Sequence, residues 1–415
     1  MKVRLLLIIY IIGVLTSCHK SGGSGAGADG KDVPEHIADL HGKMTDYLEK
    51  IKAADSVGVC VYDLTADEMV YGYRESEPMS SASCLKLLTG MAALRELGSG
   101  CDFHTTFEQV GTLQADTLRG TLLVRGDIDP LLNDTDVVNA AEALVEQGIS
   151  VVRDTICLSF PEDDGLSAEA HWVPGDIKAR QRGVNAYPHD ARERHILGAL
   201  QEGGLKTPGV KIIWQEKAKE GKVLYDVRHT LNQVVWAMWN HSSNVRSEGL
   251  LTALALHNKL GKPYRENGLR SLKAFLEDKV PQYASEAELH DGCGLCIENR
   301  MSPRLLCALL CYGWRTTSVR HELLRDLPVS GLRGTLVKEM RNSAARGHIM
   351  AKTGTLSRNG GVTSTAGFCK SRDGHMLAFV ILAAPYPTSE AHRMRAKICE
   401  ILISTDVGKD RKGNH

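Results

Sequence analysis

Apolar residues recur at helical spacing near the start of the chain. Between residues 34 and 51 this spacing predicts an amphipathic helix, with apolar positions at Ile37, Leu40, Met44, Tyr47, Leu48 and Ile51. Two β-rich runs follow, residues 57–64 and 69–73, and a short turn between them predicts a hairpin. A second helix is predicted to begin near Ser83, with apolar positions at Leu85, Leu88, Met91, Ala92 and Leu94.

The pattern changes in the middle of the chain, from residue 103 to 225. Short strand-like runs appear there, such as 120–125 and 150–158, and Gly, Asp and Pro residues interrupt them. We interpret this segment as an inserted, β-rich accessory domain. Helical spacing returns after it in three segments, residues 229–239, 246–259 and 303–312.

Three apolar-rich runs near the C-terminus, residues 348–355, 363–369 and 375–382, predict an antiparallel meander. A last helix over 389–403 is expected to cover it beside the first helix. The predicted fold class is α+β, with an antiparallel sheet flanked by helices and interrupted by an insertion. The predicted catalytic domain comprises residues 34–102 and 226–405, the insertion 103–225, and a polar tail 406–415.

The N-terminus has the pattern of a lipoprotein signal peptide. Lys2 and Arg4 precede an apolar run, residues 5–15, which ends in Leu15-Thr16-Ser17-Cys18 and is too short for a stable membrane span. Residues 1–18 are therefore the predicted signal, Cys18 the lipidated residue, and Gly/Ser-rich residues 19–33 a flexible tether. This predicts a periplasmic protein anchored to the bacterial envelope, and His19 favours the outer membrane. An ordinary signal peptide or a buried N-terminal helix is the alternative.

The composition of the chain limits the partners and cofactors to be expected. Lysine and arginine together number 50, as do aspartate and glutamate, so no net charge favours nucleic acid as a partner. Apart from Cys18 there are ten cysteines, whose pairing depends on the compartment. Four of them are spaced loosely like a zinc site: Cys293, Cys296, Cys307 and Cys311. The last two more simply occupy the buried face of a helix, so no metal is predicted.

Three short elements carry the candidate chemistry: Ser83-Cys84-Leu85-Lys86, Ser242-Ser243-Asn244 and Lys352-Thr353-Gly354. This set, in this order, is typical of β-lactamases and penicillin-binding proteins. Each element alone is weak evidence, because SxxK also occurs at residues 17–20 and SxN at residues 357–359, whereas KTG occurs once. Their order and the predicted secretory signal together favour one catalytic site.

Ser83 and Lys86 lie three residues apart at the start of a predicted helix, so the amine can reach the hydroxyl. Ser83 is the predicted nucleophile. Lys86 is the predicted base, which requires a desolvated, electropositive site that lowers its pKa. Lys352, brought in from a strand, is the predicted second cation and would also hold the terminal carboxylate of a peptide substrate.

The remaining site residues are predicted to line the same cleft. Ser242 is expected to relay a proton to the leaving amine, and Asn244 to orient Lys86 or the substrate backbone. The backbone N–H groups of Ser83 and Thr355 are the predicted oxyanion-hole donors. Three residues of the third element are assigned to binding of an extended substrate: Thr353, Gly354 and Thr355.

Purely structural roles for these residues stay open at this point. Ser83 could cap a helix while Lys86 is solvated. The second element could likewise cap the helix that follows it. Lys352 could protect an exposed edge strand. The three elements in one order make a joint catalytic role the preferred interpretation.

Longer segments surround the three elements. They are Ser81-Ala82-Ser83-Cys84-Leu85-Lys86, Gly126-Asp127-Ile128-Asp129-Pro130-Leu131, Met238-Trp239-Asn240-His241-Ser242-Ser243-Asn244 with Glu248, Asp291-Gly292-Cys293-Gly294-Leu295-Cys296 with Asn299, Arg300 and Pro303, and Leu327-Pro328 with Gly331, Gly334-Thr335-Leu336 and Ala351-Lys352-Thr353-Gly354-Thr355-Leu356. Over about residues 35 to 405 the chain resembles the class C, low-molecular-mass penicillin-binding proteins, the D-Ala-D-Ala carboxypeptidase/endopeptidase family S13. It departs from the family pattern at Ser81, Ser243, Cys293 and Cys296, none of which has a proposed chemical role.

The resemblance implies that Ser83 attacks the carbonyl between two D-alanines of a peptidoglycan stem peptide, releases the terminal D-Ala and is freed by hydrolysis. It implies no metal and no organic cofactor. A β-lactam would leave a slowly hydrolysed acyl group on Ser83. The same chemistry could instead cut a cross-link between D-Ala and a diamino acid side chain. Residues 84–241 form a shorter stretch than in relatives with two nested insertions, so one accessory domain is expected to be reduced or absent.

Three other functions stay open. A class A β-lactamase would need an additional glutamate base on a dedicated loop between the second and third elements. Glu286, Glu288 and Glu298 fall in that interval, and none of these three lies in a recognisable loop of that kind. A catalytically inactive lipoprotein that only binds peptidoglycan would not need all five predicted catalytic residues, which are Ser83, Lys86, Ser242, Asn244 and Lys352. Esterase or D-amino-acid peptidase activity is possible on the same scaffold. The oligomeric state is not predicted.

Overall fold

A computed structural model describes residues 33–53, 55–161, 189–357 and 360–409 of the protein. The predicted signal peptide, Cys18 and the tether up to residue 32 lie outside the described residues. Within these four ranges no helix combines the length and apolar character that crossing a bilayer requires.

The catalytic unit is built on a five-stranded antiparallel sheet of order β11-β12-β13-β1-β2. Its strands are β1 (Val57–Asp63), β2 (Glu68–Tyr73), β11 (Met350–Leu356), β12 (Val362–Lys370) and β13 (Met376–Ala383). The predicted hairpin and meander are confirmed, and pairing of β1 with β13 joins them into one sheet. Strand β11 lies at one edge, so its outer side is not paired within the sheet.

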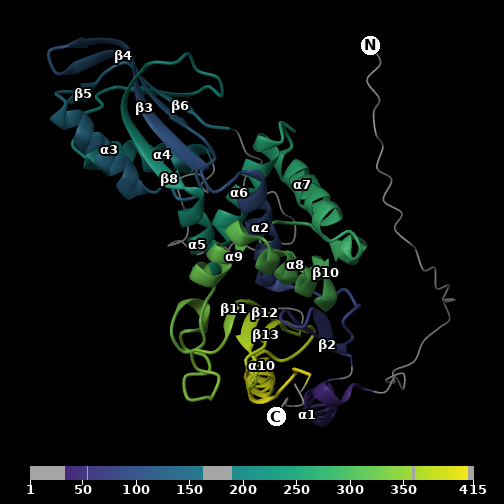
Figure 1. Ribbon diagram of the computed structural model, residues 1–415. Helices are drawn as coiled ribbons and strands as arrows, with labels where there is room; N and C mark the ends of the chain where they lie inside the picture. Colours follow the sequence, from purple (N-terminus) through teal and green to yellow (C-terminus); the bar gives the residue numbers. More distant parts are fainter. Residues whose placement is uncertain (1–32, 54, 162–188, 358–359, 410–415) are drawn as a thin grey trace, which may run out of the picture.

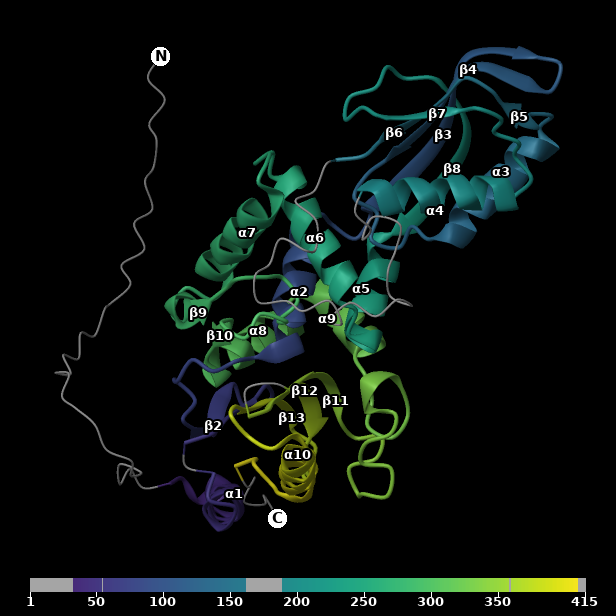
Figure 2. The ribbon, with the colours of Figure 1, turned by 180° about the vertical axis from the view of Figure 1, so that it is seen from behind.

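Helices cover both faces of this sheet. On one face lie α1 (Ala38–Lys50) and α10 (Thr388–Ser404), which share a hydrophobic core and meet at the base of the molecule as expected (Figures 1 and 2). The other face packs against α8 (Pro303–Arg315). The core on this side also includes the helices α2 (Lys86–Glu96), α5 (Leu231–His241), α6 (Asn244–His257), α7 (Tyr264–Lys279) and α9 (Thr317–Asp326). Alternate residues of β13 enter the two cores, Phe379 one and Val380 the other. This confirms the α+β class with helices on both sides.

The insertion forms a sheet of its own, of order β7-β6-β4-β3-β8 with β5 beside β4 (Figure 1). Its strands are β3 (Asp102–Gln114), β4 (Thr117–Gly126), β5 (Val151–Val152), β6 (Thr155–Ser159), β7 (Lys211–Trp214) and β8 (Lys222–Thr230). It also contains two helices that were not predicted, α3 (Asp134–Glu146) and α4 (His189–Glu202), which pack onto the sheet. The insertion is therefore α+β with partly parallel strands, and β3 and β8 extend it to residues 102 and 230.

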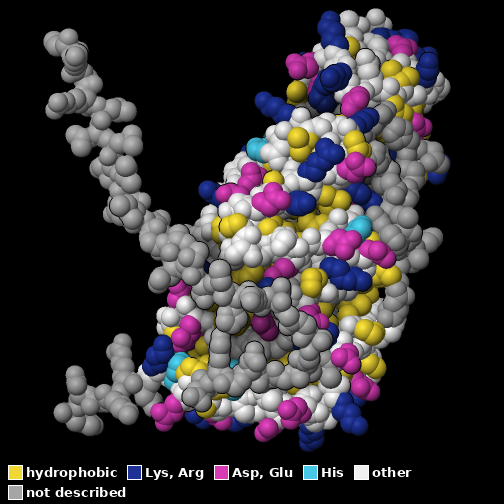
Figure 3. Space-filling view, turned by 90° about the vertical axis from the view of Figure 1, so that its right-hand side faces the viewer, with side chains coloured by type: hydrophobic (Ala, Val, Ile, Leu, Met, Phe, Trp, Pro, Cys, Tyr) yellow, Lys and Arg dark blue, Asp and Glu magenta, His cyan; other side chains and the backbone are white. Residues whose placement is uncertain are grey.

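Smaller differences lie elsewhere. Helices α7 and α9 and the short strands β9 (Ala287–Glu288) and β10 (Arg300–Met301) were not predicted. The start of the predicted polar tail is packed against the body, because Val407 is buried and its N–H donates to Asp373. On the face that Figure 3 shows, acidic and basic side chains are interspersed, in agreement with the balanced composition.

Candidate active site

The three sequence elements converge where α2, the turn between α5 and α6, and the edge strand β11 meet. Ser83 lies in a 3₁₀ turn, Ala82–Leu85, which leads into α2. Ala82 has a φ of 41°, a left-handed conformation that costs energy for a residue with a Cβ atom. Such strain is found where a neighbouring side chain must be held in a fixed direction, and that neighbour here is the candidate nucleophile.

Lys86 lies directly beside Ser83. Its Nζ is 2.8 Å from Ser83 Oγ, 2.8 Å from Asn244 Oδ1 and 2.6 Å from the backbone oxygen of Cys293. A neutral amine has two hydrogens and one lone pair. If the two carbonyl-type oxygens accept the two hydrogens, the lone pair points at the Ser83 hydroxyl. Burial of the fully enclosed Lys86 side chain lowers its pKa, although nearby Cys293 and Asp291 oppose this.

The second element forms the turn between α5 and α6. Ser242 caps α5 in a left-handed conformation (φ 57°, ψ 41°), and Asn244 is the first residue of α6. The turn directs Asn244 to Lys86 and Ser242 to Lys352, whose Nζ donates to Ser242 Oγ at 2.8 Å. The sequence spacing of two residues is therefore what allows one turn to contact both lysines.

Lys352 is the second buried cation of the site. Its Nζ also donates to the backbone oxygen of Thr353 at 2.6 Å. Burial, with the nearby charge of Lys86, lowers the pKa of Lys352 to about 7. One ammonium hydrogen beyond these two bonds is available for a substrate anion.

Strand β11 passes unusually close to Ser83. A Cβ atom on Gly354 would lie 2.7 Å from the backbone nitrogen of Ser83 and would also collide with the Ser364 side chain. A side chain at this position would require β11 or the Ser83 turn to shift, so glycine permits the close approach. The next residue, Thr355, is exposed. Its N–H group stays a predicted oxyanion-hole donor together with that of Ser83. Thr353 is buried, with its Oγ1 2.7 Å from Oγ1 of Thr335.

A loop over residues 291–296 completes the site, and we did not assign it a role from sequence. The buried Asp291 carboxylate accepts hydrogen bonds from the backbone N–H groups of Cys293, Gly294 and Cys296, at 3.0, 2.6 and 2.6 Å. These bonds hold the Cys293 carbonyl against Lys86. A Cβ on Gly294 would collide with the Ala82 carbonyl, so the loop packs directly against the strained turn that contains Ser83.

Glu248 was matched in sequence only as part of a motif. It lies on α6 four residues after Asn244, one helical turn further on, and this spacing was the signal that could have placed it near the site. Its Oε1 accepts from the Gly292 N–H at 2.9 Å. Burial, with the adjacent Asp291 carboxylate, raises the pKa of Glu248 to about 7. Glu248 therefore supports the same loop as Asp291, behind Lys86.

The four cysteines spaced like a zinc site separate in the structure. Cys293 and Cys296 belong to the active-site loop, whereas Cys307 and Cys311 lie on the buried face of α8. Among the described residues, Cys293 forms a possible ligand group with Glu248 and Asp291, whose ligand atoms lie within 4.8 Å of one another. The Asp291 oxygens are already engaged by N–H donors. We assign no metal to this cluster.

Three glutamates were considered as the base of a β-lactamase. Among the described residues, no contact joins any of them to Ser83. Glu286 pairs with Arg304, and Glu288 lies 3.1 Å from His290. Glu298 is exposed. The described residues therefore offer two lysines, two hydroxyls and one amide for acylation, and none of them places an added carboxylate base at the serine.

Comparison with known proteins agrees with this geometry. The model of the D-Ala-D-Ala carboxypeptidase 3 (S13) family matches residues 40–181 and 171–404. The D-alanyl-D-alanine carboxypeptidase DacB of Haemophilus influenzae is 21% identical over 432 residues, which cover 84% of this chain and 89% of that protein. A D-alanyl-D-alanine carboxypeptidase of Actinomadura sp. (strain R39) is 24% identical, with 91% of this chain and 87% of that protein covered.

Two solved structures have a similar fold. Penicillin-binding protein 4 of Haemophilus influenzae superposes with a TM-score of 0.71 at 20% identity, covering 86% of this chain and 97% of that one. A predatory peptidoglycan endopeptidase of Bdellovibrio bacteriovorus superposes with a TM-score of 0.56 at 14% identity, covering 85% and 94%. Because the family model spans most of the chain, the protein belongs to the D-Ala-D-Ala carboxypeptidase 3 (S13) family.

Proposed function

We propose that the protein is a serine D-alanyl-D-alanine carboxypeptidase that acts on peptidoglycan stem peptides through an acyl-enzyme on Ser83. The observation that carries this proposal is the position of Lys86, whose amine has two oxygen acceptors and Ser83 Oγ within 2.8 Å. A lysine placed in this way can remove the serine proton without any further base. The family and the names of the relatives supply the substrate class.

The reaction proceeds in two steps. In the first, Ser83 Oγ forms a bond to the carbonyl carbon as its proton passes to Lys86, and the C–N bond then breaks. The leaving D-alanine amine takes a proton through Ser242, which Lys352 holds in place. In the second, water attacks the ester, a proton returns to Ser83 Oγ, and the shortened peptide leaves. The N–H groups of Ser83 and Thr355 stabilise the negative charge on the carbonyl oxygen in both steps.

β-Lactams are proposed as inhibitors. Like a peptide that ends in D-Ala-D-Ala, they carry an amide bond that Ser83 can attack and a carboxylate close to it. A penicillin-binding protein 4 structure of Haemophilus influenzae contains a β-lactam. The absence of a carboxylate base at Ser83 among the described residues favours slow release of the acyl group over the rapid turnover of a β-lactamase.

Release of D-alanine tests this proposal. The full chain, purified in detergent, would be incubated with a stem pentapeptide ending in D-Ala-D-Ala, and free D-alanine would be measured with a D-amino-acid oxidase assay. We expect D-alanine and a peptide one residue shorter in equal amounts. An intact peptide after prolonged incubation with folded protein would contradict the proposal.

The pKa of Lys352 predicts how activity depends on pH. A lysine with a pKa of about 7 loses its charge, and its attraction for the substrate carboxylate, as the pH rises through 7. We therefore expect kcat/KM for the pentapeptide to fall above neutral pH by up to about tenfold per pH unit, because kcat/KM reports ionisation of the free enzyme. The same peptide with its terminal carboxyl amidated should lack this decline. An equal alkaline loss for both peptides would show that Lys352 does not bind the carboxylate.

We also propose that the protein is lipidated at Cys18 and anchored in the periplasm, with the outer membrane as the favoured site. The support is the sequence around Cys18 and the Gly/Ser-rich tether after it. Metabolic labelling with a clickable fatty acid should mark the wild-type protein and not Cys18→Ser. Labelling of both proteins, or of neither, would contradict the anchor.

A further inference from the structure

Two buried carboxyl groups lie close together behind Lys86, and no step of the proposed reaction uses either of them. Glu248 is 5% exposed and Asp291 is fully buried, and a carboxyl oxygen of one lies within 4.8 Å of a carboxyl oxygen of the other. Two negative charges at this separation repel each other strongly in a buried site. One of the two groups is therefore expected to hold a proton near neutral pH.

Asp291 is the better stabilised of the two as a carboxylate. It accepts hydrogen bonds from three backbone N–H groups and from the side-chain amide of Asn299, the last at 3.0 Å. Glu248 accepts from a single backbone N–H, that of Gly292, and from the Cys293 thiol. Because N–H donors favour the charged form, the proton belongs on Glu248. In agreement with this, burial and the nearby Asp291 charge raise the pKa of Glu248 to about 7.

A short stretch of backbone connects Glu248 to Lys86. The N–H of Gly292 donates to Glu248 Oε1 at 2.9 Å, and the carbonyl of the next residue, Cys293, accepts from Lys86 Nζ at 2.6 Å. Two hydroxyl groups hold the Gly292 carbonyl as well, at 2.6 and 2.7 Å: those of Thr89 and Ser247. The Glu248 carboxyl group is thus one residue of backbone away from the oxygen that binds the catalytic amine.

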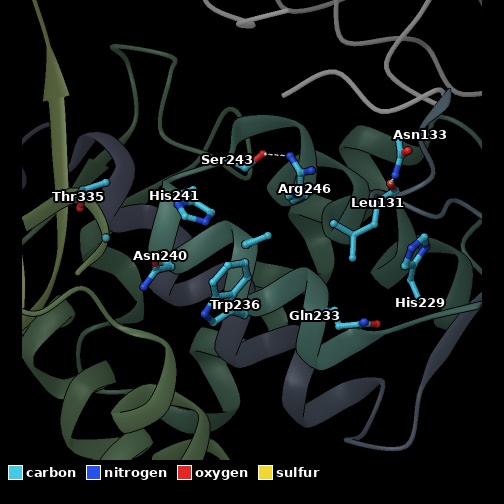
Figure 4. Close-up of a pocket in the computed structure, with 12 residues that line it drawn as sticks. Leu131, Asn133, His229, Gln233, Trp236, Asn240, His241, Ser243, Arg246 and Thr335 are labelled. Atoms are coloured by element: carbon cyan, nitrogen blue, oxygen red, sulfur yellow. Dashed lines mark hydrogen bonds between the residues drawn. The ribbon is translucent and has the colours of Figure 1, made fainter. Parts of the chain in front are cut away.

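Helix α6 separates Glu248 from the open cavity beside α5. Ser243 and Arg246, at the start of α6, line this cavity of about 720 Å³ and are joined by a hydrogen bond of 2.9 Å (Figure 4). Glu248 does not line the cavity, and α6 packs there against α2 and α7. A charge enclosed in this way is weakly screened, so it acts on neighbouring groups over several ångströms.

We propose that Glu248 is a positioning residue for Lys86, because in its neutral form it holds the backbone of residues 292–293 in place without adding a second negative charge behind the amine. This inference rests on the proposed function, in which Lys86 takes the proton of Ser83. Lys86 can accept that proton only as a neutral amine. An ionised Glu248 would favour the ammonium form and raise the pKa of Lys86. The charge of Glu248 therefore influences the pH at which acylation begins.

Other titratable groups face Glu248 from the neighbouring elements. Arg265 of α7 has its Nη2 3.7 Å from Glu248 Oε2 and favours the ionised form, whereas Asp291 opposes it. The Cys293 thiol stays neutral, because burial raises its pKa well above the usual value. The catalytic amine also interacts with the charge of Lys352. These groups stay the same when Glu248 alone is replaced, so a change in the pH profile reports the charge of Glu248.

The pH profile of acylation tests this inference. For the full chain in detergent, the second-order rate constant with a fluorescent penicillin would be measured from about pH 5 to about pH 10. Glu248→Gln is neutral at every pH and keeps an oxygen acceptor for the Gly292 N–H. We expect it to move the midpoint of the rise in rate by about one pH unit toward lower pH. Glu248→Met is neutral without an acceptor, so it should move the midpoint in the same direction and also lower the plateau, by about tenfold.

Glu277→Gln is the matched control, because Glu277 is an exposed glutamate of α7. Its midpoint should equal that of the wild type. A wild-type midpoint in both Glu248 variants, while penicillin still acylates Ser83, would overturn the role of Glu248 alone. No acylation of the folded wild type at any pH would overturn the proposed function as well.

Infrared spectroscopy of the wild type gives a measurement that needs no variant. With isotope-labelled glutamate carboxyl groups, exposed glutamates are already ionised at about pH 6 and do not interfere. We expect a protonated glutamate carboxyl group at about pH 6 that is lost by about pH 8. Absence of a protonated glutamate at about pH 6 would also overturn the inference.

Discussion

Replacing Lys86 with methionine is expected to slow acylation of Ser83 by about 10²- to 10⁴-fold, the usual contribution of a positioned general base. Methionine fills a similar buried volume but has no lone pair at the position of Nζ, which lies 2.8 Å from Ser83 Oγ. The rate would be measured with a fluorescent penicillin under single-turnover conditions. A methionine of similar volume leaves no cavity at this buried position, so the variant should remain folded.

Lys273→Met is the matched control, because Lys273 is an exposed lysine of α7. It should acylate at the wild-type rate. Thermal unfolding of both variants separates lost chemistry from lost structure. A folded Lys86→Met variant that is acylated within about threefold of the wild-type rate would rule out this lysine as the base.

Replacing Gly354 with alanine is expected to lower kcat/KM for the pentapeptide by about 10²-fold or more. The added Cβ would lie 2.7 Å from the Ser83 nitrogen, so β11 or the Ser83 turn must shift. We expect that shift to separate the N–H groups of Ser83 and Thr355, the proposed oxyanion-hole donors, and to move β11, on which the substrate is proposed to lie. A steady-state assay of D-alanine release measures the loss.

Gly42→Ala provides the comparison for this substitution. Gly42 lies in α1, and a Cβ there would meet no atom within 4 Å. We expect wild-type activity for this control. Full activity of Gly354→Ala would mean that the close approach of β11 to Ser83 has no part in catalysis.

The sequence predicted best those elements whose hydrophobic period is regular. The meander and the hairpin were placed within a few residues, because β-rich runs bounded by turns have few other interpretations. Helix α3 was missed although Asn133 and Asp136 form a capping box before Val137, Ala140 and Leu144. The short strands on either side led us to treat the whole insertion as β-rich. Its partly parallel pairing depends on contacts distant in sequence, which local patterns do not contain.

The candidate site was predictable wherever side chains carry the chemistry. Ser83, Lys86 and Asn244 stand in recognisable spacings, and the structure joins them by hydrogen bonds. Lys352 is joined to Ser242 in the same way. The carbonyl that accepts from Lys86 could not be predicted in this way, because any residue at position 293 supplies a backbone oxygen.

Intact-mass spectrometry of the full chain with benzylpenicillin tests the central claim most directly. The protein and its Ser83→Ala variant would be incubated in parallel and followed over hours. We expect the mass of one penicillin to be added to the wild type, to persist and to map to the peptide containing Ser83, and we expect no such addition to the variant. An adduct that survives in Ser83→Ala, or no adduct on folded wild-type protein, would contradict it.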